Sequence, residues 1–466
     1  MKKQRREAAE VEATPESSKG AKTPLTVPET DTIPVSIADK LPKSCTNIWI
    51  NLVGLIGLLL AFYFLRNNPN LSKLQANVIS IASYALPIIL LEIFFLKPIR
   101  NASSGIDFKS NQPFTVVRVL QKLFGFYATI GLCFYAYWLF PEYHFSFQNF
   151  YGEYWRFLLA IKYWVLLGAI PYFFLVDRFM TEPEDGYWHL GAVLTLQFSK
   201  VDWVKVKQHL LGWLVKFFFL ALMYIYMTND IQYIREVNFT SLTGHFPSQY
   251  EFFYRSIFMI DVVLATTGYI LTLRIFDAHI RSTEPTMLGW VAAIICYQPF
   301  WHFFSSQYIP YDQNGITWGA WLSGYEHVYK MWGVSILLLI LIYLWATVTF
   351  GVRFSNLTHR GILTNGPYRF CKHPAYVAKN LSWWMINVPF LIREGVNDWD
   401  RLKYCSMLLL VNLIYFIRAK TEENHLSKDP VYVEYAVKMN EKSMFSWVGF
   451  LFPFLKYKPP PGYQRS

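Results

Sequence analysis

Apolar residues in this chain are gathered into long stretches that shorter polar segments separate. Ten of these stretches are about 17–22 residues long, enough for a helix to cross the hydrocarbon core of a membrane. The ninth is the least regular of the ten, because it contains Asn380, Asn387 and Pro389. The pattern predicts an all-α fold, a polytopic transmembrane helical bundle of about ten spans. The predicted spans are residues 47–65, 76–96, 124–140, 157–176, 210–227, 256–273, 288–304, 331–350, 376–392 and 402–417.

Composition agrees with a membrane protein and excludes several other classes. Of the 466 residues, 53% are hydrophobic and only 16% are charged, whereas about a quarter of the residues of a soluble protein are charged. Disorder over the whole chain is excluded, because disordered chains have low hydrophobicity and high charge. Five cysteines are too few for a disulfide scaffold of this length. No Cys-x-x-Cys pair or histidine spacing typical of metal ligands occurs, so no metal site is expected.

Charge along the chain predicts its orientation. Residues 1–44 are polar and are expected to form a disordered cytosolic tail. The net charge is +11, and the basic residues concentrate in loops 97–123, 274–287 and 351–375. The positive-inside rule places these loops in the cytosol, together with both termini. We therefore expect a multi-pass protein of a plasma or inner membrane, or of the endoplasmic reticulum, that binds no nucleic acid. Its oligomeric state stays open.

Three ionisable residues fall within predicted spans: Glu92, Lys216 and Asp261. Such residues are costly in a membrane and are functional candidates by default. A pair between Lys216 and Asp261 across neighbouring helices is one option, although the predicted topology leaves them offset by about one helical turn. We nevertheless interpret all three as structural, either ion-paired or, for the lysine, extended toward the membrane surface.

Two segments near the C-terminus have the residue types of a chemical site. Residues 361–376 read GILTNGPYRFCKHPAY, in which Gly-Pro and His-Pro predict a structured turn that leads into a helix. Pro374 suits the first turn of that helix. Residues 418–426 read RAKTEENHL and follow the tenth span, with Arg418 and Glu422 on one helix face. The predicted topology brings both segments to the cytosolic side, where a polar cofactor enters from water and a lipid-like acceptor from the bilayer.

Together these segments resemble a known family. The order G-P-Y-R-x-x-K-H-P-x-Y, then R-A-x-x-E-E-x-x-L, then D-P-V-Y-V-E-Y is similar to isoprenylcysteine carboxyl methyltransferases and the related phospholipid methyltransferases. The resemblance covers roughly the last 120–140 residues, and the paired motif is more specific than either half. It implies a methyltransferase-like core at residues 328–466, preceded by an unassigned membrane region of about seven spans at residues 45–327.

The resemblance implies S-adenosylmethionine as cofactor and a lipidic or prenylated molecule or protein as acceptor. If the acceptor group is a carboxylate or phosphate, Arg418 can orient it; if it is an amine, Glu422 can take the proton. The sequence departs from the family where Lys372 replaces an arginine and where Ala378 replaces a glycine. By position, the cofactor-binding residues are Tyr368, Lys372, His373, Tyr376 and Glu423, and the catalytic residues are Arg418 and Glu422.

Two other functions stay open. Membrane sterol or lipid reductases that use NADPH look similar in size and in their C-terminal layout. They usually have an acidic residue where Lys379 stands and an Arg-Asp pair where Glu422 and Glu423 stand, so the motifs favour methyl transfer. The third possibility is a non-catalytic membrane protein with a degenerate methyltransferase core, which the departures at Lys372 and Ala378 keep open.

Overall fold

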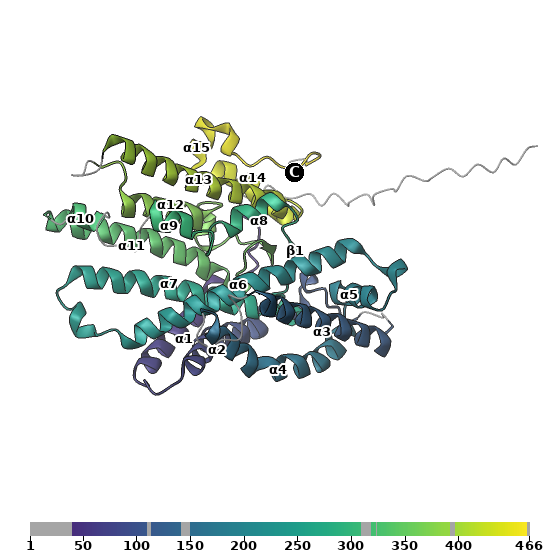
Figure 1. Ribbon diagram of the computed structural model, residues 1–466. Helices are drawn as coiled ribbons and strands as arrows, with labels where there is room; N and C mark the ends of the chain where they lie inside the picture. The colour runs from purple at the N-terminus through teal and green to yellow at the C-terminus, as the bar shows by residue number, and fades with distance from the viewer. Residues whose placement is uncertain are drawn as a thin grey trace, which may run out of the picture. The chain divides into compact units, whose positions relative to one another are not determined.

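A computed structural model describes residues 40–109, 113–140, 150–308, 318–322, 324–391 and 397–463. Residues 41–462 form one compact unit, and within the described residues it is helical except for one short antiparallel pair of strands, β1 (Ser282–Thr283) and β2 (Thr358–His359). The predicted all-α helical bundle is thus confirmed (Figure 1). The predicted tail lies outside the described residues as far as residue 39.

Eight helices of the described chain are long and apolar enough to cross a membrane, so the chain is a multi-pass membrane protein. They coincide with eight of the ten predicted spans, although α6 with 34 residues and α13 with 29 residues extend well past the apolar stretches. The eight are α1 (Ile48–Arg66), α2 (Lys73–Leu91) continued by the π-helix η1 (Glu92–Leu96), α3 (Val116–Leu139), α4 (Gly152–Asp177), α6 (Trp203–Glu236), α7 (Phe246–Ile270), α11 (Glu326–Thr349) and α13 (Asp398–Leu426).

Shorter helices connect or extend these spans. The α-helices among them are α5 (Gly186–Leu194), α8 (Met287–Ile294), α9 (His302–Gln307), α10 (Trp318–Trp321), α12 (Pro374–Asn387), α14 (Pro430–Lys442) and α15 (Ser446–Leu451). The 3-10 helices are η2 (Pro98–Arg100), η3 (Ala102–Ser104), η5 (Phe198–Lys200), η6 (Phe239–Leu242), η7 (Arg274–Phe276), η8 (Gly351–Arg353), η9 (Gly366–Arg369) and η10 (Pro453–Leu455).

Polar caps fix where several spanning helices begin. Ser72 and Gln75 form a capping box at the start of α2. The Asp202 side chain accepts hydrogen bonds from the first turn of α6, and Asn397 accepts one from Asp400 N at the start of α13. These side chains satisfy backbone N–H groups that would otherwise lack partners. The polar residues between apolar stretches therefore do more than separate the spans.

The predicted seventh and ninth spans are not single long helices. Residues 288–304 form α8, a break at residues 295–301, and α9. Pro299 lies in this break, and a proline has no N–H for the helical ladder. The ninth span is α12, whose 14 residues end before Val388, a residue with a positive φ of 36°. At 1.5 Å per residue, α12 is about 21 Å long, shorter than the hydrocarbon core.

The seventh and ninth segments still complete the path of the chain. Helices α7 and α11 run parallel, since Phe246 packs on Tyr329 near their starts and Tyr343 donates to Asp261 midway. Because α7 and α11 run in the same direction, the chain between them must cross back to the end at which both helices begin. We call the end of the bundle at which α11 ends the Arg353 end.

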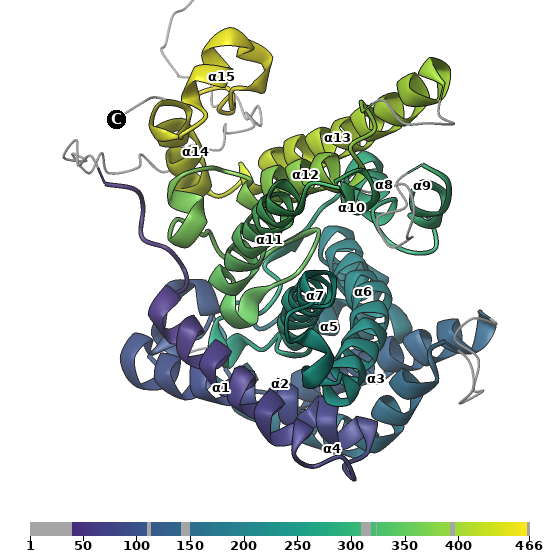
Figure 2. The same cartoon turned by 90° about the vertical axis from the view of Figure 1, so that its left-hand side faces the viewer.

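The α8–α9 segment makes this return, and it lies along α13 with its chain direction opposite to that of α13 (Figure 2). Near the Arg353 end, Tyr297 lies against Arg418, with 5.9 Å between the ring centroid and the guanidinium carbon. Further along, Tyr308 lies 5.2 Å from the Lys403 ammonium, toward the start of α13. Helix α12 makes the next return, because Trp332 at the start of α11 donates to the Met385 carbonyl near the end of α12. The broken α8–α9 segment and the short α12 thus take the places of the two missing spans.

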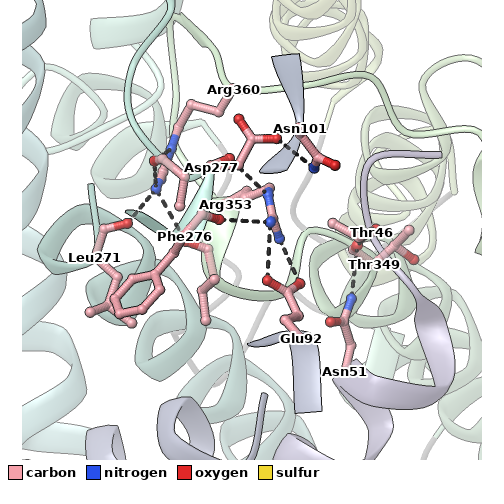
Figure 3. A network of polar contacts seen from close by, with 12 residues as sticks. Thr46, Asn51, Glu92, Asn101, Leu271, Phe276, Asp277, Thr349, Arg353 and Arg360 are labelled. Atoms are coloured by element: carbon pink, nitrogen blue, oxygen red, sulfur yellow. Dashed lines mark hydrogen bonds and ion pairs between the residues drawn. The ribbon is translucent and has the colours of Figure 1, made fainter. Parts of the chain in front are cut away.

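Buried polar contacts join segments from distant parts of the chain at the Arg353 end (Figure 3). Arg353 donates to both carboxylate oxygens of Glu92, at 2.7 and 3.0 Å, and to the carbonyls of Phe276 and Asp277. Nearby, Thr46 and Asn51 of the α1 region donate to the Thr349 carbonyl at the end of α11. Glu92 therefore has a structural partner, as its interpretation predicted.

Arg360 forms a second set of these buried contacts, and within the described chain its hydrogen-bond partners are backbone carbonyls. Its guanidinium donates to the carbonyls of Gly268 and Leu271 at the end of α7, and to three further carbonyls in residues 278 and 352–354. A cation is favourable at a helix C-terminus, where carbonyls lack N–H partners. Burial, followed by the charge of Arg353, lowers the pKa of Arg360 to about 9.

Among the described residues, no ion pair joins Lys216 to Asp261. Asp261 instead accepts a hydrogen bond of 2.6 Å from the Tyr343 hydroxyl. The Lys216 ammonium lies 4.5 Å from the centroid of the Trp213 ring, in the same helix. The two residues thus have separate partners in the described chain, and the option of a pair between them is not realised there.

Candidate active site

The first motif segment is held in place by the residues that precede α1. Thr364 donates its hydroxyl to the Pro42 carbonyl at 2.6 Å, and Asn365 donates its amide to the Thr46 carbonyl at 2.8 Å. Cys45 N donates to the Ile362 carbonyl at 2.9 Å. The loop is thereby fixed by chain that lies more than 300 residues earlier. Pro374 is at the first position of α12, as predicted.

The third motif segment closes over the same loop. Asp429 caps α14 by accepting from Val431 N, and Pro430 begins the helix. Tyr435 of α14 then donates its hydroxyl to the Tyr368 carbonyl at 2.7 Å. The order of the three motif segments therefore has a structural reason: the second ends α13, and the third turns back onto the first.

The first two motif segments meet through five side chains that the sequence analysis identified as site residues. Lys372 Nζ lies 2.7 Å from Glu423 Oε1, and His373 Nε2 lies 3.3 Å from the same oxygen. Tyr376 donates its hydroxyl to Glu422 Oε2 at 2.8 Å. The rings of His373 and Tyr376 are parallel within 2°, with centroids 5.4 Å apart. Residues about 50 positions apart in the sequence thus form one cluster.

Glu422 and Glu423 are neighbours in sequence but have different surroundings. The Glu422 side chain is 41% exposed and lines a cavity. The Glu423 side chain is only 5% exposed and does not appear in the lining of that cavity among the described residues. Its carboxylate is occupied by Lys372, His373 and Lys420. Glu423 thus holds the first motif segment through these contacts, and its direct contact with a cofactor stays a prediction.

The cavity has an empty volume of about 1270 Å³, including its open mouth. Six of the seven predicted site residues line it: Tyr368, Lys372, His373, Tyr376, Arg418 and Glu422. Further lining residues that the sequence analysis did not identify as part of the site are Tyr297, Tyr343, Asn356, Lys379 and Tyr415. The site is therefore built by α11, α12, α13, the loop between α11 and α12, and the segment after α8.

Arg418 is buried and is held by neutral partners within the described part of the chain. It donates Nη2 to Asn356 Oδ1 at 2.6 Å, and Asn356 donates its amide to the hydroxyls of Tyr269 and Tyr297. The rings of Tyr376 and Tyr415 lie 5.1 and 5.8 Å from the guanidinium carbon, within the range of cation–π attraction. The guanidinium thus presents a fixed positive charge to the cavity. No motif in the single sequence identifies Asn356 as its partner.

Lys379 of α12 is a further basic side chain in the cavity wall, besides Lys372 and Arg418. Its ammonium lies 5.2 Å from the Tyr343 ring and 5.4 Å from the Trp383 ring. Tyr343 in turn donates to Asp261, so the intramembrane acid noticed in the sequence lies directly behind the cavity wall. The spacing of Lys379 from Tyr376, three residues along α12, places both side chains on one helix face.

Comparison of this chain with protein-family models, with curated proteins and with solved structures finds no match.

Proposed function

We propose that this protein is an S-adenosylmethionine-dependent integral-membrane methyltransferase that acts on a lipidic or prenylated acceptor at the cytosolic membrane face. The observation that carries this proposal is the convergence of the two motif segments on one cavity, with Glu422 and Arg418 both in its wall. The cavity lies at the Arg353 end, where the basic residues of segments 97–109, 271–286 and 350–373 also lie. This charge distribution favours a cytosolic position for that end.

The residues present fit the chemistry of the cofactor. S-adenosylmethionine supplies a methyl group on a cationic sulfur and also carries a carboxylate and an aromatic base. The partly exposed carboxylate of Glu422 favours a cation. Lys372, His373 and the N–H groups at the start of α12 suit a carboxylate, and Tyr368 and Tyr376 offer aromatic faces. These residues are therefore proposed to bind the cofactor.

On the acceptor side, Arg418 is suited to orient an acidic group through its planar fork of donors. The surrounding rings of Tyr297, Tyr343 and Tyr415 reduce access of water, and methyl transfer needs alignment and a dry site more than a covalent intermediate. For an amine acceptor, Glu422 is the group placed to accept the proton. Both acceptor classes remain within the proposal.

The test is a pair of titrations on purified full-length protein, one with S-adenosylhomocysteine and one with NADPH. We expect saturable binding of S-adenosylhomocysteine that His373→Ala weakens, since this change removes a side chain from the cavity wall. Glu434→Gln is the matched control, because Glu434 forms a surface ion pair with Lys438 on α14. Binding of NADPH alone would contradict the proposal and favour a reductase.

The charge of Glu422 gives a sharper prediction. Glu422→Gln is expected to weaken the binding of S-adenosylmethionine, whose sulfur is cationic, by about tenfold, or 1.4 kcal/mol. It should affect S-adenosylhomocysteine, whose sulfur is neutral, much less. Calorimetric titration of both ligands against wild type and variant measures this ratio. Equal losses for the two ligands would show that Glu422 does not act on the sulfonium charge.

Lys372 predicts a dependence of cofactor binding on pH. Burial lowers the pKa of Lys372, and the Glu423 carboxylate only partly opposes this effect, while Lys420 adds to it. An exposed lysine has a pKa of about 10.4. A lysine with a lowered pKa is charged at low pH and loses its proton at a lower pH than an exposed lysine does. We therefore expect the dissociation constant of S-adenosylhomocysteine to rise as pH increases through this lowered pKa.

Lys372→Arg is the control for this pH dependence, because an arginine stays charged throughout the range. The variant should keep its affinity at the alkaline pH where wild type loses it. Titrations at successive pH values between neutral and alkaline follow both proteins. An identical alkaline loss in wild type and variant would assign the effect to another group.

A further inference from the structure

The segment after α14 exposes a continuous set of large apolar side chains. Helix α15 places Trp447, Phe450 and Leu451 on one face, since they are three and four residues apart. Three more apolar side chains lie immediately before and after the helix. We call the six residues the C-terminal ridge, and their exposed fractions range from 49% to 79%: Met444, Trp447, Phe450, Leu451, Phe452 and Phe454.

The C-terminal ridge is continuous with the lipid-facing side of a spanning helix. The ring of Phe454 lies 6.3 Å from that of Phe416 in α13. On the same face of α13, three and seven residues before Phe416, are Leu413 and Leu409, both exposed. These leucines belong to a helix long and apolar enough to cross a membrane. The ridge therefore lies at the level where that helix leaves the hydrocarbon core.

The segment that contains the ridge, from Lys442 to Lys458, carries charge of one sign. Between Lys442 and Lys458 the sequence contains three lysines and no aspartate or glutamate. All three lysines are exposed: Lys442, Lys456 and Lys458. Lysine beside exposed tryptophan and phenylalanine is typical of segments that lie in the membrane interface, with rings at the acyl boundary and ammonium groups at the phosphates. The lysines favour anionic lipids.

We propose that the C-terminal ridge is a membrane-binding surface whose partner is the anionic face of the bilayer, in the plane of the interface at the Arg353 end. The inference is independent of the proposed methyl transfer. It nevertheless concerns the same part of the molecule, because Ser443 Oγ and Met444 N both donate to the Phe370 carbonyl at 3.0 Å. Lys420 Nζ donates to the Leu455 carbonyl at 3.2 Å. The ridge thus supports the first motif segment from outside.

A spin label at position 450 tests the depth of the ridge. The full-length chain, with its five cysteines replaced by serine, receives Phe450→Cys or the control Lys428→Cys, an exposed position on the turn after α13. Both proteins are reconstituted in nanodiscs of phosphatidylcholine with phosphatidylserine. We expect the label at 450 to have a several-fold higher ratio of oxygen to nickel-chelate accessibility than the label at 428. Preserved thermal unfolding of the cysteine-free chain shows that it is folded.

Two results would overturn the proposal. Nickel accessibility at 450 equal to that at 428 would place the ridge in water. Dipolar broadening at 450 that disappears on dilution with unlabelled protein would show that a second copy of the chain covers the ridge instead. The lysines are tested separately: Lys442→Gln, Lys456→Gln and Lys458→Gln together should remove any increase in depth that phosphatidylserine causes. A depth that does not depend on phosphatidylserine in wild type would exclude the anionic component.

Discussion

Arg418→Ala is expected to lower kcat/KM for methyl transfer by about 100- to 1000-fold, the loss typical of removing one oriented donor from an active site. The reason is that Arg418 is buried, faces the cavity and is held by neutral groups, so its charge is available to an acceptor. S-adenosylhomocysteine binding should change less than the rate of transfer, because Arg418 is proposed to contact the acceptor and, of the proposed cofactor residues, lies near the ring of Tyr376. Transfer of radiolabelled methyl measures the loss.

The acceptor panel for this experiment covers the chemical classes that the proposal leaves open: a prenylated cysteine carboxylate, a phospholipid amine and a lipid phosphate. Arg418→Lys keeps the charge but loses the fork of donors, and we expect partial activity. Arg401→Ala is the matched control on the same helix, since Arg401 pairs with the exposed Asp398 near the other end of α13. Full activity of Arg418→Ala, with unchanged thermal unfolding, would remove Arg418 from the acceptor site.

The variant Asn356→Ala tests whether the position of the Arg418 guanidinium matters as well as its charge. Asn356→Ala removes the amide that joins Arg418 to Tyr269 and Tyr297. If Asn356 acts by holding the guanidinium, its loss should raise KM for the acceptor while the dissociation constant of S-adenosylhomocysteine stays the same. A purely structural role would instead lower the unfolding temperature and weaken both ligands together.

The sequence predicts the long spanning helices of this fold better than it predicts local breaks in the helices. Eight spans were identified from apolar stretches, because a helix in a membrane must be apolar over its full crossing length. The same signal failed at residues 288–304, where the apolar stretch continues across the break near Pro299 that separates α8 from α9. An average of hydropathy over a stretch does not detect such a break, but a proline interrupts the backbone hydrogen bonds of a helix at that point.

The candidate site shows a second limit. Glu422 and Glu423 are indistinguishable as letters, yet one residue along a helix turns a side chain by about 100°, which directs Glu422 to the cavity and Glu423 to Lys372. Only the position of α12 decides between them. Asn356 and Lys379 likewise become site residues through contacts with distant segments, such as the bond from Asn356 to Tyr269. A single sequence contains no record of those contacts.

Glu92→Ala is expected to lower the free energy of unfolding by about 3–5 kcal/mol, the cost of leaving one partner of a buried ion pair alone. Arg353 and Glu92 are both nearly inaccessible, with side chains 3% and 2% exposed, and their two contacts are of bidentate length. Loss of the carboxylate leaves the Arg353 guanidinium buried with only carbonyl partners. The pair joins α2 to the segment after α11, so the loss also loosens the loop that leads into the candidate site. Thermal unfolding and S-adenosylhomocysteine binding follow these two effects.

The control for this prediction is Glu251→Ala, since Glu251 and Arg255 form an ion pair on the exposed face of α7. Its removal should barely change the unfolding temperature, because exposed pairs gain little over their hydration. Combining Glu92→Leu with Arg353→Met removes both charges and should recover part of the stability, as replacing a buried pair by apolar groups often does. The recovery should be incomplete, since the carbonyls of Phe276 and Asp277 lose their donor. A double variant as unstable as Glu92→Ala would show that these carbonyl contacts, and not the unpaired charge, dominate the contribution of Arg353.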